Sequence, residues 1–334
     1  MTEMTRQTER WPMLPQPGGT FSGRRLVIIL AAGRSGSTLV QSAFLSNCNA
    51  LTFFEPCRHS PLGDVREDQC VDQVMRYLLC DLPQQNRTWN PPHVHRWFRH
   101  PYVGTDFGCR LPPFQSVSRT TEVCKRASVV LVKEIRLVGQ MHRLTRALQH
   151  RITLKNQISP AVIHLVRDPR SVIASQLRLR WHGFVDALSH RQRLEIVQMT
   201  ARRICDGMVA DATTGDQLQR AGQLQYMLVR FEELSSDLER VVYRLHDQLR
   251  MAIPSTTRLW LERMLSGDCN QGMNSSDANK DSGLNDAFEY GTCRGKFILR
   301  RVRNTNRWKH FLHAAERKSL ENLCANALAR FGYD

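Results

Sequence analysis

A buried-strand pattern followed at once by a loop of small residues constrains the fold of this chain more than any other feature. Residues 24–31 read RRLVIILA, and this short apolar run, rich in β-formers, predicts a strand buried on both faces, as in a parallel sheet. Residues 33–38 read GRSGST and predict a loop, and residues 39–45 have the apolar spacing of a helix. The order strand, loop, helix predicts an α/β fold.

The loop has the composition of an anion-binding site. Gly33 and Gly36 let the backbone approach a ligand closely, and the start of the next helix offers unpaired N–H groups and a positive dipole end. Arg34 adds a forked cation and Thr38 a hydroxyl donor. The alternative is a plain connection in which a serine caps the helix. The predicted ligand-binding residues are Arg34, Ser35, Gly36, Ser37 and Thr38.

The kind of nucleotide is narrowed by the residues around Gly36. A triphosphate-binding loop reads GxxxxGK[ST], but here Ser37 stands at the position of its Lys and Ala31 at the position of its first Gly. We therefore expect an anionic nucleotide that is held without the usual Lys and Mg²⁺.

A second strand, turn and helix repeat this geometry. Residues 161–166 predict another buried strand, and Arg167 follows at its end, where α/β sheets bind ligands. Pro169 suits an early helical position. Ser175 lies about two helical turns further along, so it reaches the same phosphate as Arg167 only if the helix folds back toward the strand end. The alternative is a surface cation and an unremarkable serine.

The remaining pattern predicts one doubly wound domain over residues 24–334. Further buried strands are expected at residues 51–54, 129–132 and 226–231. Residues 1–23 predict a disordered lead-in, and the stretches at about 57–125 and 267–295 predict irregular insertions. The expected helices span residues 138–149, 171–180, 190–212, 233–249, 255–265 and 314–330.

The charge indicates an anionic partner. The formal net charge is +16, from 47 Lys and Arg against 31 Asp and Glu, so nucleic acid, a phosphorylated cofactor and an acidic polysaccharide all qualify. The longest apolar run, residues 26–32, is far shorter than the ~20 residues of a membrane helix. The N-terminus has no signal-peptide pattern.

Cysteine usage bears on metal binding and on the compartment. The ten cysteines form no CxxC pair, which argues against a zinc site. Their even number and the sequons at Asn86 and Asn274 favour an oxidising compartment, whereas the lack of a secretory signal favours a reducing one.

Several motifs, in order along the chain, resemble one family of enzymes. RSGST at residues 34–38 resembles the RSGSS loop of the Golgi carbohydrate sulfotransferases, and LVRDPRSVIAS at residues 165–175 resembles their LVRDPRAVxxS segment. The most similar branch sulfates galactose, N-acetylglucosamine or N-acetylgalactosamine at the 6-hydroxyl and includes the keratan-sulfate and chondroitin 6-O-sulfotransferases. Supporting likenesses are FFEP at residues 53–56, LVKEIR at 131–136, VRFEEL at 229–234, Arg303-Asn304-Thr305 before Trp308-Lys309, and FGY at 331–333.

The resemblance implies a P-loop NTPase-like sheet and a donor, 3′-phosphoadenosine 5′-phosphosulfate. In this family the first loop binds the 5′-phosphosulfate, so that role falls to residues 34–38. The second loop binds the 3′-phosphate, so that role falls to Arg167 and Ser175, and Arg303 is expected to join the donor site. The resemblance also implies an acidic or neutral glycan acceptor, no nucleic acid, no required metal, and a type II membrane protein of the Golgi lumen, although no anchor is visible in this sequence.

Three positions depart from the family pattern. Thr38 stands for a usual Ser and keeps the hydroxyl. Glu134 stands for a Thr, which weakens the likeness of the strand around Lys133. Cys57 stands for the usual residue after the Pro of the FFEP motif.

Sulfuryl transfer requires a base for the acceptor's proton and cations for the charge that gathers on the bridging oxygen. Glu55 is the candidate base, because it follows the apolar strand at residues 51–54, where partial burial raises the pKa of a carboxylate. Related sulfotransferases acting on polysaccharides use a Glu near this point. Lys133 is the candidate for stabilising the leaving phosphate.

The same two residues have plainer alternatives. The alternatives for Glu55 are a solvated loop carboxylate or an ion-pair partner for Arg58, and the alternative for Lys133 is a strand-end side chain that reaches solvent. If Glu55 is not the base, His59 is the next candidate.

Two other functions remain open on the residues alone. A P-loop kinase or NTPase requires a Walker Lys and a Mg²⁺-binding Asp on a neighbouring strand, but residues 129–132 end in Lys133. A non-catalytic basic module that binds glycan or nucleic acid fits the charge, but it does not explain two strand–loop–helix anion sites, and no nucleic-acid-binding motif is visible.

Overall fold

A computed structural model describes residues 24–47, 49–58, 67–82, 117–152, 160–180, 188–266 and 307–333. The predicted lead-in at 1–23, the predicted insertion at 267–295, Arg303 and His59 lie outside the described residues.

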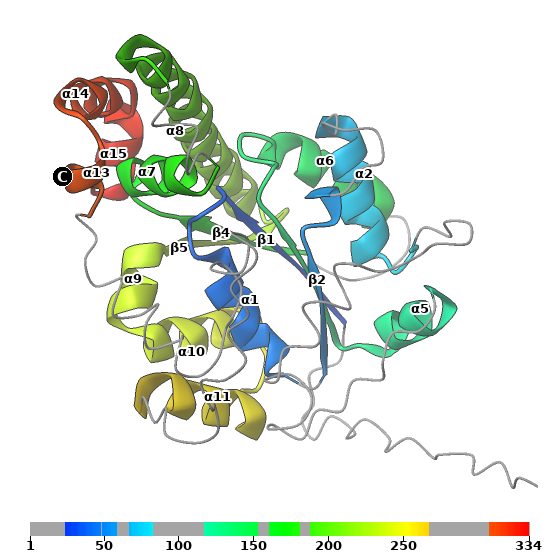
Figure 1. The fold of residues 1–334 in the computed structure, drawn as a ribbon. Coiled ribbons are helices and arrows are strands. Elements are labelled where there is room, and N and C mark those ends of the chain that lie inside the picture. Colours follow the sequence, from blue (N-terminus) through cyan, green and yellow to red (C-terminus); the bar gives the residue numbers. More distant parts are fainter. Residues whose placement is uncertain are drawn as a thin grey trace, which may run out of the picture.

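Five parallel strands form the centre of the molecule (Figure 1). They are β1 (Arg25–Ala31), β2 (Ala50–Phe54), β3 (Val129–Glu134), β4 (Ala161–Val166) and β5 (Gln225–Arg230). Their order across the sheet is β2-β3-β1-β4-β5, and every neighbouring pair is parallel. The predicted parallel α/β sheet is therefore confirmed. The order reverses at β1, and ligands of open α/β sheets bind at such a point, beyond the carboxyl ends of the strands.

The unbroken apolar sequence of β1 is explained by burial on both faces. Val27, Ile29 and Ala31 pack with α1 (Ser37–Leu45), α10 (Leu238–Gln248) and α11 (Ser255–Ser266). Leu26, Ile28 and Leu30 point the other way, toward α2 (Glu67–Leu78), α5 (Val117–Arg126) and α6 (Met141–Ile152). Figure 1 shows these two helix layers on opposite sides of the sheet. The alternation follows from the two-residue period of a strand.

A third group of helices packs beside β4 and holds the C-terminal part of the chain. In this group, α7 (Pro169–Arg180) and α8 (His190–Arg220) contact each other, and α8 also contacts α14 (Ala314–Leu323) and α15 (Ala325–Phe331). The remaining elements are the short helix η1 (Pro56–Arg58), α9 (Phe231–Ser236) and α13 (Trp308–Phe311).

The irregular stretch predicted at 57–125 is wrong where the structure describes it, since α2 and α5 lie inside it. Helix α2 has a strongly polar sequence, yet its buried residues recur at helical spacing and pack under the sheet. That spacing was readable in the sequence but was hidden by the polar composition. The buried residues of α2 are Cys70, Val71, Val74, Met75 and Leu78.

The predicted helices differ from the observed ones in their limits, by one to three residues at 138–149, 171–180 and 255–265 and by an extension or a division in the other three. The helix expected at 190–212 continues to Arg220. The helix expected at 233–249 divides into α9 and α10 because the Asp237 side chain accepts a hydrogen bond from the Arg240 N–H and starts a new helix. The helix expected at 314–330 divides at Cys324, whose backbone leaves the helical region.

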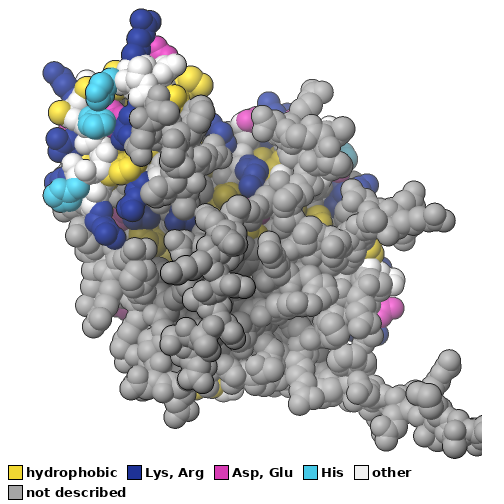
Figure 2. All heavy atoms as spheres, viewed as in Figure 1, with side chains coloured by type: hydrophobic (Ala, Val, Ile, Leu, Met, Phe, Trp, Pro, Cys, Tyr) yellow, Lys and Arg dark blue, Asp and Glu magenta, His cyan; other side chains and the backbone are white. Residues whose placement is uncertain are grey.

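Positive charge is visible on the face shown in Figure 2, where Lys, Arg and His side chains gather over the region of α8, α13, α14 and α15. In the described part of the chain, no helix combines the length and apolar character needed to cross a bilayer.

Among the described residues, three disulfides tie separate elements together: Cys57–Cys70, Cys80–Cys124 and Cys205–Cys324. The last joins α8 to the break between α14 and α15 across 119 residues of sequence. Because a cross-link over a long loop restricts the unfolded chain most, this bond is expected to stabilise the fold substantially.

Replacing both Cys205 and Cys324 with Ser is expected to lower the free energy of unfolding by about 2–5 kcal/mol. Urea denaturation of variant and wild type measures the loss. Thiol mapping of the unreduced wild type serves as the control, and alkylation of both cysteines without a reductant would refute the pairing.

Candidate active site at the carboxyl ends of the strands

The loop between β1 and α1 leads into a helix whose N-cap residue makes no side-chain capping hydrogen bond. Gly36 is the N-cap of α1, with a left-handed φ of 88°, and no side chain caps the helix. The first turn of α1 contains no acidic residue. The serine cap is therefore wrong, and the N-terminus of α1 is a positive helix end that suits an anion.

Gly36 is required here by its neighbour as well as by its backbone. A Cβ at this position would lie 2.4 Å from two ring carbons of Phe231, the first residue of α9. Ser35 lies beside it, and its Oγ is buried with no hydrogen-bond partner among the described residues. A buried hydroxyl without a partner is costly, so this Oγ is a candidate hydrogen-bond partner for a ligand.

The second predicted anion loop meets the first. Arg34 Nε donates to Ser175 Oγ at 3.1 Å, and Arg167 Nη1 donates to the Arg34 carbonyl at 3.0 Å. Gln176 adds a third contact, donating from Nε2 to the Gly33 carbonyl at 2.8 Å. The helix does fold back, so Arg34, Arg167 and Ser175 lie together although 141 positions separate Arg34 from Ser175.

One aromatic ring supports both loops. The guanidinium carbon of Arg167 lies 4.3 Å from the centre of the Phe231 ring, the same ring that Gly36 approaches. Such a cation–π contact holds the Arg167 guanidinium in place without neutralising it.

The predicted catalytic residues form a buried ionic cluster at the ends of β2 and β3. Glu55 Oε1 accepts from Lys133 Nζ at 2.9 Å, and Oε2 accepts from Arg136 Nη1 at 3.0 Å. The side chains of Lys133 and Glu55 are only 2% and 7% exposed. The solvated readings of Glu55 and Lys133 are therefore wrong.

Lys133 links this cluster to the phosphate loop. Its Nζ also donates to Thr38 Oγ1 at 3.2 Å and lies 3.6 Å from the centre of the Phe54 ring. The connection follows from the sheet, because Lys133 pairs with Phe54 on one side and with Ile29 of β1 on the other.

The pKa of Glu55 is lowered, whereas burial alone was expected to raise it. Burial does raise the pKa of Glu55, but the Lys133 ammonium and the Arg136 guanidinium outweigh it, so the pKa lies below the ordinary carboxyl range. Burial lowers the pKa of Lys133, although Glu55 and Glu134 oppose that change. Glu55 is thus a carboxylate at neutral pH, the form that a base requires.

The sequence reasoning assigned no role to Arg136, Gln176 or Phe231, although each contacts a predicted site residue. Arg136 is the last residue of the LVKEIR motif at residues 131–136, so the sequence did contain an indication that it belongs to the site. Nothing in the sequence indicates that Phe231 lies under Gly36, because that contact depends on the position of β5.

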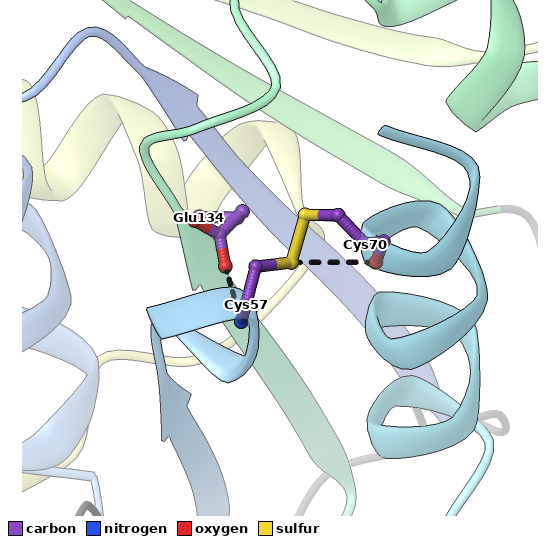
Figure 3. A group of neighbouring side chains, drawn as sticks. All are labelled: Cys57, Cys70 and Glu134. Atoms are coloured by element: carbon purple, nitrogen blue, oxygen red, sulfur yellow. Dashed lines mark hydrogen bonds between the residues drawn. A yellow bond between two sulfur atoms is a disulfide. The ribbon is translucent and has the colours of Figure 1, made fainter. Parts of the chain in front are cut away.

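One group of described residues has metal-ligating atoms close together, namely Cys57, Cys70 and Glu134 (Figure 3). The two sulfurs are joined in a disulfide, so neither is a thiolate that a metal would need. Glu134 instead accepts a hydrogen bond from the Cys57 N–H at 3.0 Å.

Replacing Gly36 with Ala is expected to destabilise the protein by about 1–3 kcal/mol more than replacing Gly222 with Ala. Both glycines have positive φ, so the backbone cost is shared, but a Cβ at Gly222 meets nothing within 4 Å. Urea denaturation of the two variants gives the difference. Equal losses would mean that the Phe231 contact does not require glycine.

Comparison with known proteins identifies the family. A family profile for the sulfotransferase domain matches residues 24–332. Carbohydrate sulfotransferase 1 of Rattus norvegicus is 25% identical over 371 residues, covering 96% of this chain and 83% of that protein. Carbohydrate sulfotransferase 6 of Homo sapiens is 24% identical, covering 96% of this chain and 84% of that protein.

Among solved structures, the chain is similar to the sulfotransferase domain from the curacin biosynthetic pathway. The TM-score is 0.49 at 14% identity, covering 93% of this chain and 98% of that one. On the match of the family profile to residues 24–332, the chain belongs to the sulfotransferase domain family and is a sulfotransferase enzyme homologous to carbohydrate sulfotransferases.

Proposed function

We propose that this enzyme transfers a sulfuryl group from 3′-phosphoadenosine 5′-phosphosulfate to a sugar hydroxyl, the 6-hydroxyl of galactose, N-acetylglucosamine or N-acetylgalactosamine in a glycan. The observation that carries the proposal is the contact between the two anion loops through Arg34, Arg167 and Ser175. Two adjacent anion sites suit a nucleotide with separate 3′ and 5′ phosphate groups.

The residues of the first loop fit the 5′ end of this donor. The uncapped N-terminus of α1 and the unpartnered Ser35 Oγ offer hydrogen-bond donors, and Gly36 keeps the backbone open to a ligand. In the proposal Ser35, Ser37 and Thr38 bind the 5′-phosphosulfate. Arg34 extends from this loop to Ser175 and thereby joins the two phosphate sites.

The second loop would hold the 3′-phosphate through Arg167 and Ser175. Asp168 is engaged by Arg170 in an ion pair of 3.0 Å, and the charges of Glu232 and Asp168 also act on Arg167. Arg303 is proposed as a further donor-binding residue on the family resemblance alone.

The chemistry assigned to the chain is positioning and proton transfer. The donor supplies the sulfuryl group. Glu55 takes the proton of the acceptor hydroxyl, and its lowered pKa keeps it ionised for that purpose. Lys133 bonds both Glu55 and Thr38, so a small movement of its ammonium toward the phosphate loop frees Oε1 of Glu55 and places a cation where charge develops on the leaving phosphate.

The acceptor and the compartment are proposed on the family resemblance. A net charge of +16 favours an acidic glycan, and a neutral glycan acceptor rests on the resemblance alone. The disulfides within the described residues suit an oxidising lumen, and we propose that the enzyme works in the Golgi. No metal is required in this proposal.

Calorimetry of nucleotide binding tests the donor assignment. We expect 3′-phosphoadenosine 5′-phosphate to bind far more tightly than ATP with Mg²⁺, because the loop lacks the Lys of triphosphate-binding loops. Tighter binding of ATP with Mg²⁺ would favour the kinase or NTPase alternative.

Replacing Arg167 with Ala is expected to remove a charged hydrogen bond, typically worth ~1.5–3 kcal/mol, or at least ~10-fold in Kd. The loss should appear for 3′-phosphoadenosine 5′-phosphate and not for adenosine 5′-phosphate. Arg202→Ala, at an exposed position of α8, is the control and should change neither. A variant that keeps the wild-type preference between the two nucleotides would refute the assignment of this loop.

Replacing Glu55 with Gln keeps the size of the side chain but removes the base. We expect kcat to fall ~10²–10⁴-fold, the usual contribution of a positioned base, while nucleotide affinity changes little. Transfer is measured on galactose, N-acetylglucosamine and N-acetylgalactosamine glycosides, and NMR of the product identifies the sulfated hydroxyl. A loss of only a few-fold would assign the proton to another residue, of which His59 is the first to test.

A further inference from the structure

Glu55 lies in a strained turn, and the turn is held from one side. Its φ is 46°, in the left-handed region that non-glycine residues adopt only when their surroundings enforce it. The Glu55 N–H donates to the Lys133 carbonyl at 2.8 Å, which extends the pairing of β2 with β3 by one residue. Something beyond this single bond must hold the following turn.

Glu134 supplies that support from the end of β3. Its side chain is fully buried, and Oε2 accepts from the Cys57 N–H at 3.0 Å, two residues after Glu55. Cys57 is in turn bonded to Cys70 of α2 through the disulfide. Figure 3 shows Cys57 between the two, with Glu134 on one side and α2 on the other.

The other oxygen of Glu134 orients Arg136. Oε1 accepts from the N–H groups of Ile135 and Arg136 at 2.9 and 3.1 Å, and from Arg136 Nη1 at 3.2 Å. The same Nη1 donates to Glu55 Oε2 at 3.0 Å. One guanidinium nitrogen therefore bridges Glu134 and the candidate base. Burial raises the pKa of Glu134, and these N–H donors oppose the rise by stabilising its ionised form.

We propose that Glu134 is a positioning residue for sulfuryl transfer, and that together with the Cys57–Cys70 disulfide it holds the Glu55 carboxylate in its working place. The inference rests on the proposed role of Glu55 as base. Glu134 and Cys57 are two of the positions at which this chain departs from the family pattern, and they are bonded to each other. The two departures from the family pattern thus act on the same turn, the one that carries Glu55.

The test weakens the support of the Glu55 turn in two independent ways. Glu134→Gln keeps the size of the side chain but replaces one carboxylate oxygen with an amide NH₂ group, which cannot accept the N–H hydrogen bonds of that oxygen. Cys57→Ser with Cys70→Ser removes the link to α2. Each is expected to lower kcat at least ~10-fold, since a displacement of about 1 Å at a reacting group costs up to ~10²-fold. The KM for 3′-phosphoadenosine 5′-phosphosulfate should stay within about twofold, because neither change touches the phosphate loops.

The matched control is Cys205→Ser with Cys324→Ser, which removes a disulfide outside this cluster. Assayed below its melting temperature, this control should keep the wild-type kcat. Glu55→Gln is the benchmark and separates two kinds of failure. If Glu55→Gln abolishes transfer but Glu134→Gln and the Cys57/Cys70 variant keep kcat, the positioning role alone is overturned.

If Glu55→Gln itself retains kcat, the proposed base and the positioning role both fall. Should Glu134→Gln not fold, the Cys57/Cys70 variant decides between these outcomes. A parallel loss of kcat, donor affinity and melting temperature in that variant would mean that the disulfide is only structural, and this result also overturns the inference.

Discussion

Burial of β1 on both faces is the constraint on which the rest of this structure depends. Its apolar side chains, from Leu26 to Ala31, are at most 2% exposed, and they pack alternately against the helix layers on the two faces of the sheet. Because β1 sits between β3 and β4, the loop that follows it emerges at the centre of the sheet, next to the ends of both neighbours. Arg34 can therefore meet the β4 loop while Thr38 meets Lys133 of β3.

The ionic cluster at the ends of β2 and β3 is costly to bury, and its contacts explain how it is tolerated. Taking charges out of water is repaid only when opposite charges and hydrogen bonds satisfy every atom. Lys133 has Glu55, Thr38 and the Phe54 ring around its ammonium, and both oxygens of Glu55 have a cation. A buried pair of this kind adds little net stability. Its place at the strand ends, beside the phosphate loop, supports the catalytic role proposed for Glu55 and Lys133.

The fold and the two strand–loop–helix connections were predictable because they depend on local patterns. Continuous apolar runs mark strands that are covered on both faces, and glycine with a following helix marks the loop. The end of β3 was less evident, because Lys133 and Glu134 are charged residues that are nonetheless buried. Helix α2 was not predicted because most of its residues are polar and only five of its side chains are buried.

Predictions for the site failed where an answer depended on contacts between distant segments. The pKa of Glu55 was expected to rise, but it falls because the Lys133 ammonium of β3 and the Arg136 guanidinium just beyond β3 lie against its carboxylate. The role of Arg136 depends on the register of β2 with β3, and the place of Phe231 on the course of β5. None of these can be read from spacing within one segment. Arg303 lies outside the described residues, and its assignment stays a prediction.

The ring of Phe231 has a consequence for how such a site can vary. The Phe231 ring leaves no room for a Cβ at position 36, and the Arg167 guanidinium lies over the same ring. This single side chain therefore contacts two loops, whose residues Gly36 and Arg167 are 131 positions apart in sequence. A larger or smaller residue at this position disturbs both loops at once, and no change in one loop alone restores the other. Variation at these three positions is therefore linked, and among related chains the identity of residue 231 should change only together with the residues at 36 and 167.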